Sequence, residues 1–184
     1  MSYNLLKGKR GVIFGALNEQ SIAWKVAVRA VEEGATIVLS NTAMAIRMGQ
    51  VNELAKQLNC EVIPADATSY EDMENVFARA QEILGGQIDF VLHSIGMSPN
   101  VRKKRTYDDL DYKFLSQTLD ISAVSFHKMI QAAKKQNAIA DIRQQVSVLS
   151  VSIAEKILRQ KLSDDKSQMA YVDKLLDDVS SDAK

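Results

Sequence analysis

Glycine and serine residues near the start of the chain have the types and spacing of a phosphate-binding turn. Gly15 ends the short apolar run Val12-Ile13-Phe14, and Ser21 comes just before an apolar pattern of helical period. A glycine turn between a strand and a helix lets the backbone approach a phosphate, which the N–H groups and dipole of the helix start attract. The spacing differs from Gly-x-Gly-x-x-Gly, so a plain strand–helix turn without a ligand is the alternative for this stretch.

Further polar groups come at the ends of two expected strands. Asp66 follows the third strand, and His93-Ser94-Ile95-Gly96 ends the fourth. The carboxyl ends of strands line the ligand crevice of a doubly wound sheet, where a carboxylate can accept from an adenine amino group and a glycine admits a ribose. Ordinary turns at Asp66 and Gly96 are the alternatives. We expect His93 to be structural, because no nucleophile or carboxylate partner is evident for it.

Alternating strands and helices are expected to position these residues. The helical stretches begin near Ile22, Met48 and Ser69, and they alternate with four strands, expected at Gly11–Phe14, Thr36–Ser40, Cys60–Pro64 and Ile88–His93. Three of the strands are nearly continuous apolar runs, which is typical of strands covered on both faces. The sequence therefore predicts an α/β fold, a Rossmann-like doubly wound parallel sheet with right-handed crossovers.

Helical periodicity dominates after Pro99. Neither glycine nor proline, the strongest turn formers, occurs beyond this residue. Apolar spacing predicts one long helix over Leu110–Ala133 and a two-heptad apolar seam over Ile139–Ile153. Gln145–Ser152 also fits a short strand, but helix is favoured because the apolar stripe continues beyond it. A last short amphipathic helix is expected over Met169–Val179.

Charge and composition narrow the classes of protein. The chain has 23 basic and 23 acidic residues, a balance that argues against nucleic acid as the main partner. No apolar run approaches the roughly 20 residues of a membrane span, and the N-terminus has no apolar signal core. The single cysteine, Cys60, fits a reducing compartment and is expected to pack in the core. We expect a cytoplasmic protein without a metal site.

One dense run of charge stands out, Arg102-Lys103-Lys104-Arg105. Such a run is ordinarily a solvated loop. Its functional alternative is recognition of an acidic partner or a phosphate group, since clustered cations attract both.

Four sets of residues in combination point to a family. They are Gly15 with Ser21-Ile22-Ala23, then Asp66-Ala67, then His93-Ser94-Ile95-Gly96, and finally Asp120-Ile121-Ser122 with Ser125-Phe126. In this combination the chain resembles the NADH-dependent enoyl-acyl-carrier-protein reductases of the short-chain dehydrogenase/reductase superfamily. The resemblance covers residues 1–140 and implies a dinucleotide-binding Rossmann-type domain there. It implies reduction of an enoyl double bond in fatty-acid synthesis, an acyl-carrier-protein thioester as partner, and a homo-oligomer.

The same resemblance implies that NADH is the cofactor and assigns residues to it. Gly15, Ser21 and Ile22 would bind the pyrophosphate side of NADH. Thr42 would lie by the adenosine ribose, and Asp66 and Ala67 by the adenine. Ser94, Ile95 and Gly96 would lie along the ribose and nicotinamide. Ser98 would lie near the acyl substrate. The segment Ser40-Asn41-Thr42 lacks the acidic residue that grips a ribose 2′-hydroxyl, so the residues alone leave NAD and NADP both open.

The chain departs from the family at the catalytic pair, a tyrosine followed seven residues later by a lysine. The positions seven residues after the five tyrosines hold Arg10, Phe77, Phe114, Leu119 and Asp178. Only Tyr3 has a lysine four residues on, Lys7, and this pair comes before the first expected strand. We assign no catalytic residue, regard the Rossmann-type domain as truncated, and expect no turnover above background.

Residues 141–184 form the second expected domain, a helical tail. Ala140-Asp141-Ile142-Arg143, Ile153-Ala154-Glu155-Lys156 and the stretch Asp173–Asp178 resemble the C-terminal part of the b subunit of F-type ATP synthase. That subunit is a stator whose tail docks on a partner. The alternative function is therefore a non-catalytic interaction protein with a stator-like docking helix.

Overall fold

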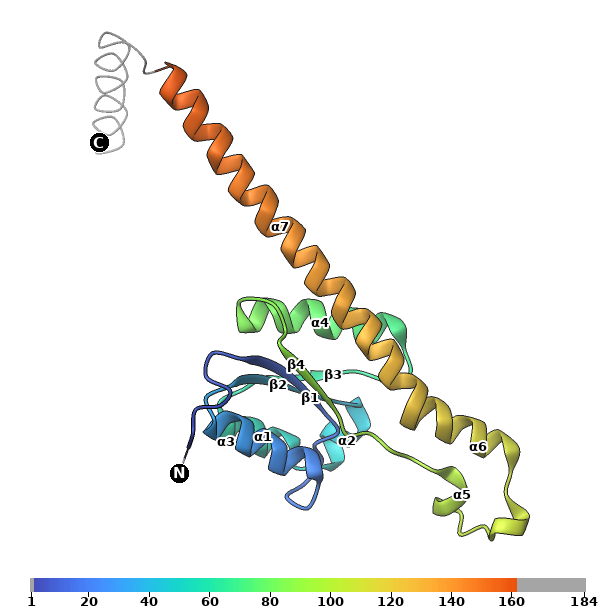
Figure 1. Cartoon of the computed structure of the whole chain (residues 1–184). Coiled ribbons are helices and arrows are strands. Elements are labelled where there is room, and N and C mark those ends of the chain that lie inside the picture. The colour runs from blue at the N-terminus through green and yellow to red at the C-terminus, as the bar shows by residue number, and fades with distance from the viewer. Residues whose placement is uncertain (1, 162–184) are drawn as a thin grey trace, which may run out of the picture. The chain divides into compact units, whose positions relative to one another are not determined.

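The computed structural model describes residues 2–161. Its strands form one parallel sheet in the order β3-β2-β1-β4 (Figure 1), with bounds β1 Arg10–Phe14, β2 Thr36–Asn41, β3 Val62–Pro64 and β4 Phe90–His93. This confirms the predicted α/β class. The third strand begins at Val62 rather than Cys60, because the Cys60 N–H still donates to Ala55 O at the end of the preceding helix.

Helices cover both faces of this sheet, as Figure 1 shows. Helices α1 (Ile22–Glu32) and α3 (Val51–Leu58) lie on one face, and α4 (Tyr70–Leu84) lies on the other with the first part of α7 (Ser125–Lys161). The helix expected around Met48–Leu58 is preceded by a separate short one, α2 (Ala43–Met48), which ends at Gly49.

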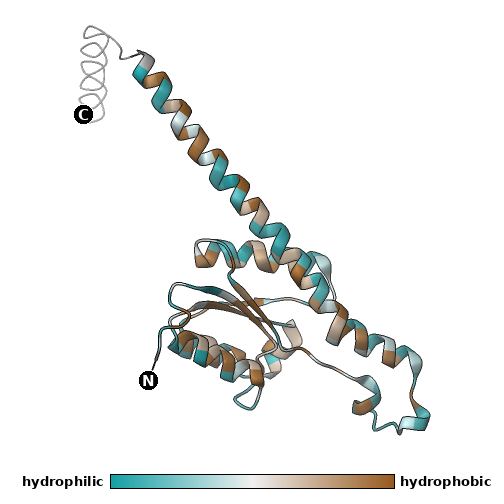
Figure 2. Ribbon diagram, in the orientation of Figure 1, coloured by the Kyte–Doolittle hydropathy of each residue, from teal (hydrophilic) through white to brown (hydrophobic). Residues whose placement is uncertain are grey.

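Strand residues alternate between two apolar layers. Val12 and Phe14 of β1 pack toward α4 and α7, where Met129 and Ala132 complete the layer. Ile13 packs toward α1 and α3 on the other face. Figure 2 shows the strands as the most hydrophobic part of this region, between helices whose two sides differ in polarity. Because helices cover both faces of the sheet, each strand is held in place and its carboxyl end lies at a fixed position.

The single helix expected over Leu110–Ala133 is wrong in its start and its regularity. Two short turns, α5 (Pro99–Arg102) and a 3₁₀ turn η1 (Tyr107–Asp109), precede α6 (Tyr112–Leu119). Helix α6 begins where the Asp111 carboxylate accepts from the N–H groups of Lys113 and Phe114, at 2.8 and 3.4 Å. A π-helical turn, η2 (Asp120–Val124), joins α6 to α7.

The chain divides into two compact units between Ala140 and Asp141. In the second unit Gln145–Ser152 is part of helix α7, so the favoured prediction of a helix there is confirmed and the strand alternative is wrong. The apolar seam there is exposed, with 61% of Ile142, 60% of Leu149 and 50% of Ile153 accessible to solvent. The helix expected over Met169–Val179 lies outside the described residues. None of the helices in residues 2–161 is long and apolar enough to cross a membrane.

Candidate functional site

A cleft of about 460 Å³ lies at the carboxyl edge of the sheet. Seven of the residues predicted to hold a cofactor line it, namely Gly15, Thr42, Asp66, Ala67, Ser94, Ile95 and Gly96. They come from the loops after all four strands, which the parallel topology brings to one edge. The predicted residues Ser21, Ile22 and Ser98 are not among those that line it.

Gly15 closes the centre of this cleft, where β1 and β4 end side by side. Its N–H donates to Ser40 O at 3.1 Å, and the Ser94 N–H donates to Phe14 O at 3.2 Å. Gly15 has φ +95°, and a Cβ there would lie 2.0 Å from Ser94 O. Since both the conformation and the contact exclude a side chain, the close approach of the two loops requires glycine at this position.

The loop after Gly15 is shaped by Ser21, the residue before α1. Its hydroxyl donates to Asn18 O at 2.7 Å and accepts from the Leu17 N–H at 3.2 Å. The Asn41 side chain, at the end of β2, donates to Ala16 O at 2.9 Å. The Ser21 side chain makes no capping bond to α1, so it acts on this loop rather than on the helix start.

Two other predicted residues lie apart from the cleft. Ile22 is 73% exposed and lines a separate apolar hollow with Leu5, Val26 and Phe90. Ser98 precedes α5, and its hydroxyl accepts from the Val101 N–H at 3.5 Å. Their spacing in the sequence placed them near the site, but their side chains face other surroundings.

Asp66 and Thr42 line the cleft and also end turns. Asp66 Oδ1 accepts from the N–H and the hydroxyl of Thr68, at 2.9 and 2.7 Å. Thr42 Oγ1 accepts from the Ala45 N–H at 3.3 Å and begins α2. One oxygen of Asp66, Oδ1, therefore serves the turn, as the alternative for this residue predicted. Its Oδ2 makes no hydrogen bond within residues 2–161 and remains available to a ligand.

His93, at the end of β4, is held by α7 and has a structural role. Its Nε2 lies 2.8 Å from Ser125 Oγ, and that hydroxyl donates to Ile121 O at 2.6 Å. Because the single hydroxyl hydrogen is used, Nε2 must carry the proton donated to Ser125. Burial lowers the pKa of His93, which favours this neutral form.

The π turn forms the outer wall of the cleft. Ser122 Oγ accepts from the Met97 N–H at 3.2 Å, which ties the loop after β4 to this turn. Lys128 Nζ donates to Asp120 Oδ1 at 3.1 Å and to Thr68 O at 3.0 Å. The lysine therefore joins the turn to the loop that carries Asp66.

Sequence reasoning missed several residues of the cleft. Leu17, Ala45, Met97 and Gln117 also line it, together with Arg102 from the basic run. The first three directly neighbour predicted segments, so that proximity alone could have suggested them. Gln117 has no such signal, since only the fold of α6 against the loop after β4 brings it to the cleft.

The sequence matches the family model described as Enoyl-(Acyl carrier protein) reductase over residues 15–163. The match continues past Ala140, the residue at which we expected the resemblance to end. The predicted likeness of the tail to an ATP synthase b subunit gains no support from these comparisons, and neither does the interaction-protein alternative.

Individual relatives agree with the family model. The chain is similar to an enoyl-[acyl-carrier-protein] reductase [NADH] from Rickettsia bellii, 30% identical over 159 residues, which are 86% of this chain and 59% of the relative. It is 37% identical over 123 residues to one from Rhizobium meliloti, covering 66% of this chain and 44% of that one.

Solved structures give the same result. A crystal structure of a FabI–NADH complex from Alistipes finegoldii superposes with a TM-score of 0.72 and 70% sequence identity, covering 74% of this chain and 48% of that one. The chain thus spans about half the length of the relatives it matches. On the family match, which extends over most of the sequence, the chain belongs to the enoyl-(acyl carrier protein) reductase family.

Proposed function

We propose that the carboxyl-edge cleft binds NADH, and that the chain represents the cofactor-holding half of an enoyl-acyl-carrier-protein reductase. The observation that carries this is the convergence of Gly15, Asp66 and Gly96 on one cleft. A Cβ built on Gly96 meets nothing within 4 Å, so the packing of the chain does not require glycine there. A ligand that lies against the backbone does require it.

The residues present fit the adenosine half of a dinucleotide. Asp66 offers a carboxylate oxygen to an amino group, and α1 begins after the glycine loop, so that its first N–H groups would attract the pyrophosphate. The backbone of Ser94 and Ile95 would border the ribose. Lys128 and Ser125 would hold the outer wall in place through Asp120 and His93.

When bound, NADH supplies the hydride that reduces an enoyl thioester, the substrate class we propose from the family. This chain holds neither the tyrosine nor the lysine of the family's catalytic pair in the required spacing. A positioned donor of this kind commonly contributes roughly 2.7 to 4 kcal/mol to the stabilisation of the transition state. We therefore expect NADH binding without turnover of crotonyl thioesters by this chain.

The test is calorimetric titration with NADH of the wild type and Ser21→Asp. A carboxylate at the start of α1 would repel the pyrophosphate and should weaken binding by about 1 to 3 kcal/mol. Ser69→Asp is the matched control, because Ser69 precedes α4 in the same way and aspartate is a good residue there. It should leave NADH affinity unchanged.

Equal NADH affinity of the wild type and Ser21→Asp would contradict the pyrophosphate assignment. A crotonyl-thioester assay runs in parallel on the same preparations. An NADH-dependent rate that Gly15→Glu abolishes would show that another residue of this chain has taken the role of the tyrosine.

We also propose that the chain self-associates. The seam from Ile142 to Ile153 exposes large apolar side chains in water, and a short amphipathic helix is marginal alone. Light scattering should therefore report a species larger than the 20.4 kDa chain. A compact monomer would rule this out.

A further inference from the structure

We propose that Arg102 and Lys104 form a phosphate-recognition point at the mouth of the cleft, for the phosphate ester at the carrier end of the thioester substrate. The inference rests on the proposed function, since it takes the cleft to be the substrate's entrance. It concerns a different part of the cleft from the residues assigned to NADH.

Arg102 is the one member of the basic run that lines the cleft. It ends α5, which follows directly on the Ser94–Met97 wall. Within residues 2–161 its guanidinium makes neither a hydrogen bond nor an ion pair, and the same holds for the Lys104 ammonium. Both side chains are exposed, so each can meet a charged group that arrives from solvent.

The other two cations of the run are already engaged. Lys103 Nζ lies 4.1 Å from the centre of the Phe114 ring, a distance at which a cation is attracted by the ring face. Arg105 donates to the backbone oxygen of Asp109 at 3.0 Å and to its carboxylate at 3.1 Å. These contacts fix the loop and leave Arg102 and Lys104 as its available charges.

The base of the loop is clamped as well. Asn100, which is buried, exchanges two hydrogen bonds with Asp111, from its side-chain amide to Asp111 O at 3.1 Å and from the Asp111 N–H to its Oδ1 at 3.0 Å. At Lys104 the backbone turns back with φ +54°, and its N–H donates to Val101 O at 3.0 Å. A loop held at both ends in this way presents its cations in a set position instead of as a solvated tail.

Within residues 2–161 no carboxylate is paired with Arg102 or Lys104. Asp109 is paired with Arg105, Asp111 caps α6, and Asp108 accepts a hydrogen bond from Thr106 that lowers its pKa. Asp120, on the facing wall, is paired with Lys128. Guanidinium groups bind phosphate oxygens through two parallel N–H donors, which makes Arg102 the stronger contact and Lys104 a supporting point charge.

The position of Arg102 in the cleft favours the carrier end of the substrate, rather than the nucleotide, as the group that it binds. Thr42 and Asp66 follow β2 and β3, on one side of the cleft, whereas Arg102 follows β4 at the other. The nucleotide assigned to the first side already meets its phosphates at the Gly15 loop. The anionic group left for Arg102 is the phosphate that links a pantetheine thioester to its carrier.

The experiment compares crotonyl-pantetheine with crotonyl-phosphopantetheine, which differ only in the phosphate, by calorimetry with NADH present. The wild type should bind the phosphorylated probe about tenfold more tightly, and this preference should shrink as salt is added. Arg102→Gln combined with Lys104→Gln should abolish the preference. Lys56→Gln is the matched control, because it removes an exposed cation from α3 without touching the cleft.

Equal affinity of the wild type for the two probes, or a preference that survives in the double variant, would overturn the inference. A third arm titrates the apo carrier protein, which has no pantetheine arm. Weaker binding of that carrier to the double variant, with the probe preference intact, would assign the cations to carboxylates on the carrier and also overturn it. NADH titrated alone separates the failures, because the proposed function fails only if the wild type does not bind NADH.

Discussion

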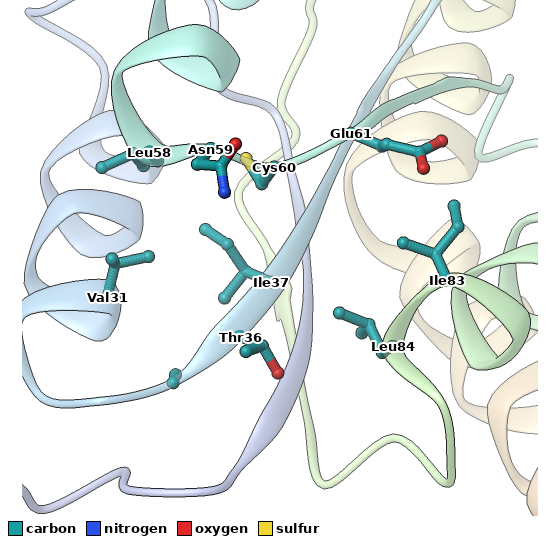
Figure 3. Close-up of a pocket in the computed structure, with 10 residues that line it drawn as sticks. Val31, Thr36, Ile37, Leu58, Asn59, Cys60, Glu61, Ile83 and Leu84 are labelled. Carbon is teal, nitrogen blue, oxygen red and sulfur yellow. The ribbon is translucent and has the colours of Figure 1, made fainter.

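The two ends of the sheet each carry a hollow of similar size, lined by different parts of the chain. The carboxyl-edge cleft measures about 460 Å³ and the amino-edge pocket about 560 Å³. Figure 3 shows the second, gathered around the start of β2, with Val31 and Leu58 on one side and Ile83 and Leu84 on the other. Volume therefore does not distinguish a binding site in this molecule.

The direction of the strands explains the difference. At the carboxyl edge the chain leaves the sheet through loops whose glycines, Gly15 and Gly96, line the cleft, and α1 and α4 begin there. At the amino edge the same helices end, and their last apolar residues meet around Thr36. A parallel sheet thus gathers the starts of its helices at one end and their last turns at the other.

Charged groups at the amino edge serve the fold. Burial alone would raise the pKa of Glu33, but the N–H groups of Leu5 and Tyr3 and the Arg29 guanidinium outweigh it and lower that pKa. The hydrogen bond from Lys9 Nζ, at 2.8 Å, lowers the pKa of Asp89. These carboxylates tie the N-terminal segment to the sheet.

The largest effect is expected from Gly15→Ala at the carboxyl edge. The new Cβ would lie 2.0 Å from Ser94 O, so the loops must separate. The free energy of unfolding should fall by about 3 to 5 kcal/mol, measured by urea denaturation. Gly85→Ala is the control, with φ +69° but nothing within 4 Å of its Cβ. It should cost only about 1 to 2 kcal/mol. Equal costs would show that the contact with Ser94 is unimportant.

The amino-edge pocket predicts an unreactive thiol. Burial raises the pKa of Cys60 from 9.0 to about 11. The thiolate fraction at pH 8 is then about a hundredfold lower than in the unfolded chain, and alkylation by iodoacetamide should slow by a similar factor. The rate in urea is the reference. Alkylation of the native protein at the unfolded rate would show that this pocket opens readily to solvent.

Gly96→Ala separates binding from folding at the carboxyl edge. Because a Cβ there meets nothing within 4 Å, the melting temperature should stay unchanged. NADH affinity should fall about tenfold if a ribose lies against this backbone, since a methyl group displaces it. Calorimetry and thermal melting on one preparation give both values. Unchanged affinity would remove Gly96 from the site.

The smallest effect is expected in how the free energy of unfolding falls at acid pH. Glu33 and Asp89 have pKa values lowered from 4.5 and 3.8, so they stabilise the fold above those values, and this contribution is lost as pH falls through their folded pKa values. Glu33→Gln combined with Asp89→Asn should flatten the fall in the urea midpoint below pH 4.5. Glu82→Gln, whose side chain is 67% exposed, should leave that slope intact. An unaltered slope in the double variant would show that other groups cause the loss of stability at acid pH.

Local sequence was sufficient to predict the parallel sheet and seven of the residues that line the cleft. Gly15, Asp66 and Gly96 each lie within three residues of a strand end, so their positions depend mainly on where that strand ends. Cys60 shows a limit of prediction from neighbouring residues. It was expected in the core but is only partly buried, and its N–H bonds to Ala55 O at the end of α3 instead of starting β3.

Residues whose place depends on contacts between distant segments could not be predicted. Gln117 and Asp120 reach the cleft because hydrogen bonds from Met97 and Lys128 hold the π turn against the loops. Ile22 shows a different limit. It begins α1 close to the glycine loop in sequence, but its exposed side chain lines a separate hollow with Phe90.

The π turn has a consequence for how this chain tolerates insertions and deletions. One residue in an α-helix corresponds to a rotation of about 100°. A π turn holds one residue more than an α-helical turn, so loss of a single residue from Asp120–Val124 would leave an ordinary α-helical turn there. The same loss from the start of α7 would instead rotate Met129 and Ala132, which are fully buried against the sheet, out of the core together. A deletion should therefore be better tolerated in the π turn than in the helix that follows it.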